Sequence, residues 1–166
     1  MKFEKWVPVG ISAAEERWWL LSGAGVPLLM GLGFLIRYAN AYQNLYRTVN
    51  GHRELIDGVK IQDFAKLLRP MPVLSLAGGA LVMLGLLVYH WLYHYQGSRS
   101  IYLMRRLPRR FELTRRCLTV PLVEALVCLA VTLVLVLLFY WLYQSVTPDV
   151  CLRPRQWQKL WMEGWL

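Results

Sequence analysis

Three long apolar stretches alternate with four polar segments along this chain of 166 residues. Residues 18–36 contain no charged side chain over nineteen positions, and residues 72–95 and 118–146 are comparably apolar. About 20 apolar residues in a helix are enough to cross the hydrocarbon core of a bilayer. The pattern therefore predicts an all-α polytopic membrane protein with three transmembrane helices and short interfacial helices beside them.

The first polar segment, residues 1–17, balances three basic side chains against three acidic ones. Ser12 and Glu15 have the spacing of a capping box, in which two side chains satisfy free N–H groups at the start of a helix. This spacing predicts a helix that starts near Ala13 and leads into the first span. We interpret the segment as cytoplasmic or interfacial.

The second polar segment, residues 37–71, connects the first two spans. Asn50-Gly51 and Asp57-Gly58 are turn signals within it. After these turns, four apolar residues share one face if the chain is helical: Ile61, Phe64, Leu67 and Leu68. We expect a short amphipathic helix here, resting on the membrane surface or on a partner.

The last polar segment, residues 147–166, begins with Thr147-Pro148-Asp149, which stops the third span. Trp157, Trp161 and Trp165 follow at steps of four residues and form one stripe if the tail is helical. The tail is too short and too polar to cross a bilayer. We expect a helix that lies in the membrane interface or docks to a partner.

Composition agrees with this organisation. Apolar residues make up 57% of the chain, against roughly 45–50% in soluble domains. Eight Trp and nine Tyr suit a protein with two membrane–water boundaries. The net charge of +9 comes from basic side chains that flank apolar spans. Anionic lipid head groups or an acidic protein surface are therefore better partners than nucleic acid.

The segment of residues 96–117 carries the densest charge, with seven arginines and one acid between Ser98 and Arg116. Basic residues in short loops beside a span favour the cytoplasmic side of the membrane. Three spans put the N-terminus and this segment on the same side. The sequence therefore predicts a multi-pass protein of the cell membrane in which both are cytoplasmic, while residues 37–71 and the tail lie outside the cell.

The spans themselves carry few polar or very small side chains. Gly23 and Gly25 in the first span, and Ser75 with Gly79 in the second, allow another helix to approach closely. Glu124 is the one acidic residue within a span, about two helical turns from its start. Its position favours a structural role, in which the carboxylate reaches the interface or pairs with a nearby arginine.

Few residues point to catalysis or to a cofactor. His90 and His94 have the i, i+4 spacing of a metal pair, but no carboxylate or cysteine stands near them in sequence, so we interpret them as polar tips of an aromatic belt. The chain has no Walker A loop and no hydrolase or metalloprotease motif. We therefore expect a non-enzyme without cofactor or metal, and any ATP would bind a partner subunit.

The basic segment has two interpretations. Pro108 divides it into two short helical pieces, and apolar side chains such as Leu107 and Phe111 lie among the arginines. Such a surface could bind anionic lipid or dock a cytoplasmic protein, and the apolar anchors favour docking. The docking candidates are Leu103, Arg105, Arg106, Leu107, Pro108, Arg109, Arg110, Phe111 and Glu112.

The segment also carries a short motif, formed by Tyr102-Leu103-Met104, Leu107, Pro108, Arg110 and Glu112. With the spans around it, this motif resembles the first half of type-2 ABC exporter permeases, whose basic stretch between the second and third spans contacts the ATPase subunit. The resemblance implies that the segment is a coupling region. Because those permeases carry six spans, it also implies either a half-permease completed by a partner chain or an accessory subunit.

On this basis the sequence predicts a non-catalytic transmembrane subunit of a bacterial ABC-type exporter. It would dock an ATPase subunit through its arginine-rich loop and contact other membrane subunits through its glycine-faced spans. The alternative is a membrane adaptor or scaffold whose basic loop binds anionic lipids, without transport activity.

Overall fold

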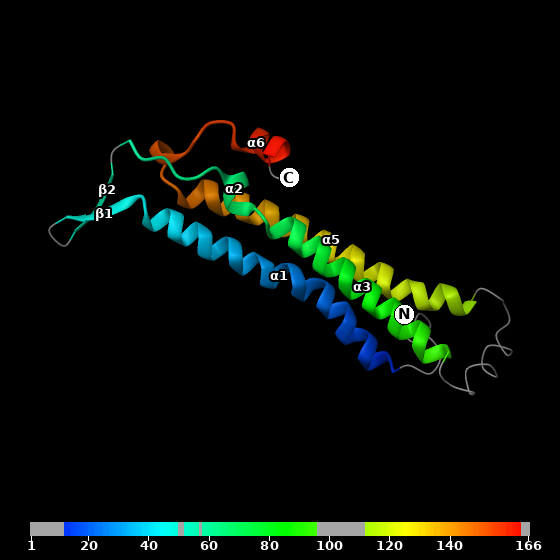
Figure 1. Ribbon diagram of the computed structural model, residues 1–166. Helices are drawn as coiled ribbons and strands as arrows, with labels where there is room; N and C mark the ends of the chain where they lie inside the picture. Colours follow the sequence, from blue (N-terminus) through cyan, green and yellow to red (C-terminus); the bar gives the residue numbers. More distant parts are fainter. Residues whose placement is uncertain (1–11, 50–51, 57, 96–111, 164–166) are drawn as a thin grey trace. The chain divides into compact units, whose positions relative to one another are not determined.

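The computed structural model describes residues 12–49, 52–56, 58–95 and 112–163. Most of these residues are helical. The elements follow one another as α1 (Ala13–Gln43), β1 (Tyr46–Val49), β2 (His52–Leu55), α2 (Phe64–Leu68), α3 (Met71–Tyr95), α5 (Glu112–Val146), the 3₁₀ helix η2 (Asp149–Cys151) and α6 (Gln156–Glu163) (Figure 1).

Three stretches are helical, long and apolar enough to cross a membrane: Ala14–Gln43, Phe64–Tyr93 and Thr114–Val146. They confirm the prediction of three helices of spanning length. Large apolar side chains point outward from them, with Leu81 70% exposed and Leu126 62% exposed. Since such a surface is favourable in lipid and unfavourable in water, the three helices indicate a multi-pass membrane protein.

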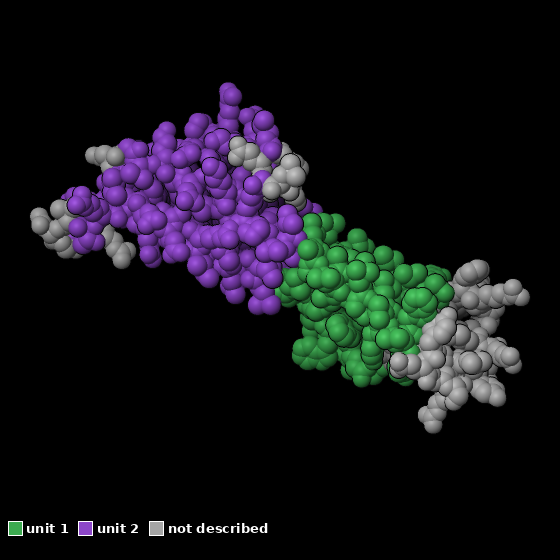
Figure 2. Space-filling model, viewed as in Figure 1, with its two compact units in different colours: residues 1–26, 76–131 green, residues 27–75, 132–166 purple. Residues whose placement is uncertain are grey.

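The chain forms two compact units, coloured separately in Figure 2. Unit 1 comprises Met1–Val26 and Leu76–Val131, and unit 2 comprises Pro27–Ser75 and Thr132–Leu166. The start of α1, the end of α3 and the start of α5 therefore belong to unit 1. The hairpin, α2, η2 and α6 belong to unit 2.

Helix α1 begins where the capping-box spacing predicts. Its first residue is Ala13, and the backbone N–H of Glu15 donates to the side-chain oxygen of Ser12 at 3.3 Å. This bond satisfies one of the N–H groups that have no partner within the first turn of a helix. The helix start is thus fixed by local sequence.

In unit 1, α1 and α3 both approach α5 closely at a glycine. A Cβ atom added to Gly23 of α1 would lie 2.8 Å from the main-chain oxygen of Glu124 in α5. One added to Gly79 of α3 would lie 2.5 Å from Sγ of Cys128 in α5. Gly25, by contrast, lies where an added Cβ would meet no heavy atom within 4 Å. The close approaches therefore depend on Gly23 and Gly79.

The core of unit 2 is aromatic. Phe34 of α1 stacks on Phe139 of α5 with ring centroids 4.4 Å apart. Phe64 of α2 meets Phe34 edge-on at 5.8 Å and lies 5.4 Å from Tyr143 of α5. The remaining residues of the predicted apolar face are buried in the same core: Ile61, Leu67 and Leu68. The short helix thus packs on its own chain, whereas a membrane surface or a partner was expected.

Two strands depart from the expected all-α fold. β1 and β2 pair antiparallel, with Tyr46 opposite Leu55 and Val49 opposite His52. The two residues between the strands are Asn50-Gly51, which lie outside the described residues. Because Asn-Gly favours the two-residue turn of a β-hairpin, the turn signal in the sequence marked a hairpin and not an irregular connection.

We expect Gly23→Ala to destabilise unit 1, by about 1–3 kcal/mol as is typical of overpacking. The new Cβ would overlap the main-chain oxygen of Glu124, which cannot move without displacing α5. Gly25→Ala is the matched control, because its Cβ would meet open space. Its stability should be unchanged or higher by up to about 1 kcal/mol. Unfolding in detergent micelles measures both, and equal losses in the two variants would contradict this packing.

Candidate functional site

A polar network joins the three helices of unit 1. Nε2 of His90 in α3 lies 2.6 Å from Oε1 of Glu16 in α1. Nδ1 of the same ring lies 3.1 Å from the carbonyl oxygen of Cys117 in α5. The side chains of Glu16 and His90 are fully buried. The network therefore ties the start of α1 and the start of α5 to the end of α3.

The partners of His90 determine where its protons lie. A carbonyl oxygen can only accept, so Nδ1 carries a proton and donates it to Cys117. Nε2 and Oε1 of Glu16 must share one further proton, because two lone pairs 2.6 Å apart would repel each other. Whether this proton rests on oxygen or nitrogen, the pair holds the same number of protons and has no net charge.

Glu124 is a second buried acid in unit 1, and its side chain packs against Gly23. Neither of its carboxyl oxygens has a hydrogen-bond partner among the described residues. The expectation that the carboxyl reaches the interface is wrong, because it is buried, and no described arginine pairs with it. Since an unpaired carboxylate is very costly in an apolar interior, we infer that Glu124 is a neutral acid.

The interpretation of His90 as the tip of an aromatic belt is also wrong. His90 is fully buried, while its neighbours Tyr89 and Trp91 are exposed. Its partner Glu16 stands 74 positions earlier in the chain, and no local motif links them. The side chain of His94 lies outside the described residues. Within the described part of the chain, no group of three or more His, Cys, Asp or Glu residues could hold a metal.

The other predicted site residues fall in several places. The docking candidates from Leu103 to Phe111 lie outside the described residues. Glu112 is the first residue of α5. Ser75, predicted to pack helices together with Gly79, is buried in unit 2 and donates to the carbonyl of Met71 within its own helix at 2.8 Å.

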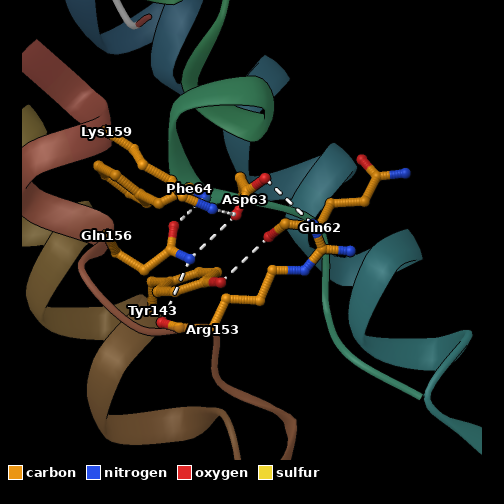
Figure 3. Close-up of polar contacts among 7 residues, drawn as sticks. All are labelled: Gln62, Asp63, Phe64, Tyr143, Arg153, Gln156 and Lys159. Carbon is orange, nitrogen blue, oxygen red and sulfur yellow. Dashed lines mark hydrogen bonds and ion pairs between the residues drawn. The ribbon is translucent and has the colours of Figure 1, made fainter. Parts of the chain in front are cut away.

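A second polar cluster holds helix α6 in unit 2 (Figure 3). Asp63, just before α2, accepts hydrogen bonds from Lys159 at 2.9 Å and from Gln156 at 3.1 Å. Arg153 pairs with the other carboxylate oxygen at 3.2 Å. The side-chain oxygen of Gln156 accepts from the N–H of Phe64 at 2.9 Å. The tail thus docks on its own chain, whereas the membrane interface or a partner was expected.

Two further hydrogen bonds fasten the connection before α2. The hydroxyl of Tyr143 donates to the carbonyl of Gln62 at 3.0 Å, as Figure 3 shows. The N–H of Ile61 donates to the carbonyl of Cys151 in η2 at 3.1 Å. The segments before α2 and after α5 are therefore held together by backbone as well as side-chain bonds.

The Asp63 cluster surrounds an ionised carboxylate. Burial alone would raise the pKa of Asp63, but the hydrogen bonds from Lys159 and Gln156 and the positive charge of Arg153 outweigh it. Its pKa therefore lies below the ordinary value for an aspartate. The group is charged at neutral pH and acts as the anchor of α6.

Comparison with protein-family models, with curated proteins and with solved structures found no match to this chain.

The two polar clusters differ in chemistry. In unit 2 an ionised acid is neutralised by two cations, which is a structural arrangement. In unit 1 the buried Glu16–His90 pair shares a proton between helices of spanning length, where ionisable groups are expensive and are candidates for function. The Glu16–His90 network with Glu124 is therefore the candidate functional site.

We expect acid to release α6 from unit 2. Because the pKa of Asp63 is lowered by folding, its contribution to stability is complete above the unfolded value of about 4. It is lost as the pH falls through the folded pKa. Hydrogen exchange of residues 156–163, relative to intrinsic rates, should accelerate in that range.

Hydrogen exchange of residues 156–163 should already be fast at neutral pH in Asp63→Asn. This variant keeps the size of the side chain and removes its charge. Asp149→Asn is the control, since it removes an exposed acid from the neighbouring η2. It should exchange like the original protein. Equal protection of α6 in the Asp63→Asn and unsubstituted proteins at neutral pH would exclude the anchoring role.

Proposed function

We propose that the chain is a non-catalytic transmembrane subunit of a bacterial ABC-type exporter. It docks a cytoplasmic ATPase subunit through the basic segment of residues 96–117. One observation carries the proposal: the hydrogen bond between His90 and Cys117 holds the end of α3 beside the start of α5. The arginines between these helices therefore connect two helix ends at one end of unit 1.

This arrangement favours docking for a physical reason. Seven arginines cannot enter hydrocarbon, so the segment belongs in water beside the membrane. A loop whose two ends are fixed loses less conformational entropy when it binds a partner than a loop with free ends. Arginines with interspersed apolar side chains are typical of protein-binding surfaces. The fixed ends thus make the basic segment a suitable docking element.

The same reasoning supports a cytoplasmic location for the N-terminus and the basic segment. If each of the three helices of spanning length crosses the membrane, the N-terminus and the basic segment lie on the same side of it. The arginines next to the spans favour the cytoplasmic side. ATP would be hydrolysed by the partner, because the sequence contains no P-loop of its own.

Of the glycines expected to allow close helix approach, Gly25 would serve contacts with other membrane subunits, and Gly23 and Gly79 would not. Gly23 and Gly79 are occupied by packing within unit 1. Gly25 has open space around it and exposes the face of α1 to a further helix. A partner span that packs on this chain is therefore expected to approach α1 at Gly25.

We expect reversal of the four central arginines, Arg105, Arg106, Arg109 and Arg110, to Glu to abolish co-purification of an ATPase from membranes in mild detergent. The charge reversal removes the cationic contacts and repels an acidic docking surface. The control reverses four bases of the connection between the first two spans: Arg47, Arg53, Lys60 and Lys66. That variant should retain the ATPase. The adaptor alternative holds instead if no ATPase co-purifies with the unsubstituted protein and the reversal weakens only binding to anionic liposomes.

Topology gives an independent test. In a chain whose native cysteines are replaced by serine, a cysteine introduced at Ser98 should resist a membrane-impermeant thiol reagent added to intact cells. A cysteine introduced at Thr48 in β1 should react, because three spans place it on the opposite side. Labelling of position 98 from outside would rule out contact with a cytoplasmic ATPase.

A further inference from the structure

We propose that Glu16 and His90 form a proton-binding site that holds the three helix ends of unit 1 closed while its proton is bound. Loss of the proton releases the start of α1. The inference rests on the geometry of unit 1 alone and is independent of what docks on the basic segment.

The closed state contains a neutral pair. Oε2 of Glu16 is buried and has no hydrogen-bond partner among the described residues. An ionised carboxylate would spread charge onto this oxygen, and burial without hydrogen bonds penalises charge far more than a neutral carbonyl. The proton therefore rests on Oε1 of Glu16, which donates to Nε2 of His90.

The hydrogen bonds then run in one direction across three helices. Glu16 donates to His90, and Nδ1–H of His90 donates to the carbonyl of Cys117. This assignment uses every polar hydrogen of the two side chains. It also gives the imidazole a defined tautomer, with its proton on Nδ1, which can be measured.

The ionisable groups around the pair lie nearer the surface. The network residues are Glu16, His90 and Cys117. The ionisable groups within one helical turn of them are Glu15 and Arg17 on α1, Tyr89 and Tyr93 on α3, and Arg115, Arg116 and Cys117 itself on α5. None of them is fully buried. Glu124, the other buried acid of unit 1, stands seven residues after Cys117 on α5, which is about two helical turns.

Removal of the shared proton makes the closed geometry untenable. The proton leaves Oε1 of Glu16 for water, and no other bond changes. Oε1 and Nε2 would then be two acceptors 2.6 Å apart, one of them charged. Since their lone pairs repel and the charge lacks hydrogen bonds, Glu16 turns toward water. The first turns of α1 then separate from α3.

The tautomer is tested first, in the unsubstituted protein labelled with ¹⁵N histidine. In the closed state, in which the backbone amides of the helix ends are protected from hydrogen exchange, NMR should show a neutral His90 ring with its proton on Nδ1. A proton on Nε2 with Nδ1 bare would overturn the proposal. So would a doubly protonated ring beside an ionised Glu16.

The closure is tested by hydrogen exchange of residues 13–20 and 86–95 as a function of pH, relative to intrinsic rates. Once the pair releases its proton, protection should fall by up to about tenfold per pH unit, because opening is linked to the loss of one proton. Glu16→Gln should remove this dependence, since its amide donates to Nε2 at every pH. Glu15→Gln changes the exposed neighbouring acid and should behave like the unsubstituted protein.

The variants leave clear alternatives. The same pH dependence in Glu16→Gln as in the unsubstituted protein would show that another group controls opening and would overturn the proposal. Loss of the dependence in Glu15→Gln would do the same. If Glu16→Gln does not fold, the His90 tautomer in the unsubstituted protein decides.

Discussion

The two hydrogen bonds of His90 are the contact on which unit 1 depends. In lipid no hydrophobic force drives helices together, so their association depends on close packing and polar contacts. Gly23 and Gly79 provide the packing, and the imidazole of His90 reaches one helix with each ring nitrogen. Because the His90 side chain is buried, losing either bond would leave one of its ring nitrogens without a partner in an apolar bundle. One side chain thus holds three helix ends.

The three buried acids among the described residues offset the cost of burial in three ways. Asp63 stays ionised, because Lys159, Arg153 and Gln156 surround it. Glu16 shares its proton with His90. Glu124 has no described partner, which favours its neutral form. The difference follows from location. Asp63 lies just before an apolar segment, where the cationic side chains of Lys159 and Arg153 reach it. Glu16 and Glu124 are instead buried among the helices of unit 1.

The sequence predicted what depends on local pattern. Hydrophobic runs predicted the three long helices, and Ser12 with Glu15 predicted the start of α1. The hairpin was not predicted, because Asn50-Gly51 was recognised only as a turn signal and the residues on either side were not interpreted as strands. The Glu16–His90 pair could not be predicted, since its members are 74 positions apart and each has an ordinary role by itself. A histidine beside aromatic residues is usually interfacial, and only the packing of α1 on α3 makes this one a partner for an acid.

The network and the basic segment are mechanically related. Five arginines lie in the link between α3 and α5, and their mutual repulsion favours separation of the two helix ends. The bond from His90 to Cys117 opposes that force at the base of the link. If Glu16 loses its proton, the imidazole loses the donor that orients it, and its hold on α5 weakens as well. Protonation of one buried carboxyl would therefore set how firmly the ends of the basic segment are held, and with them the surface that a cytoplasmic partner meets.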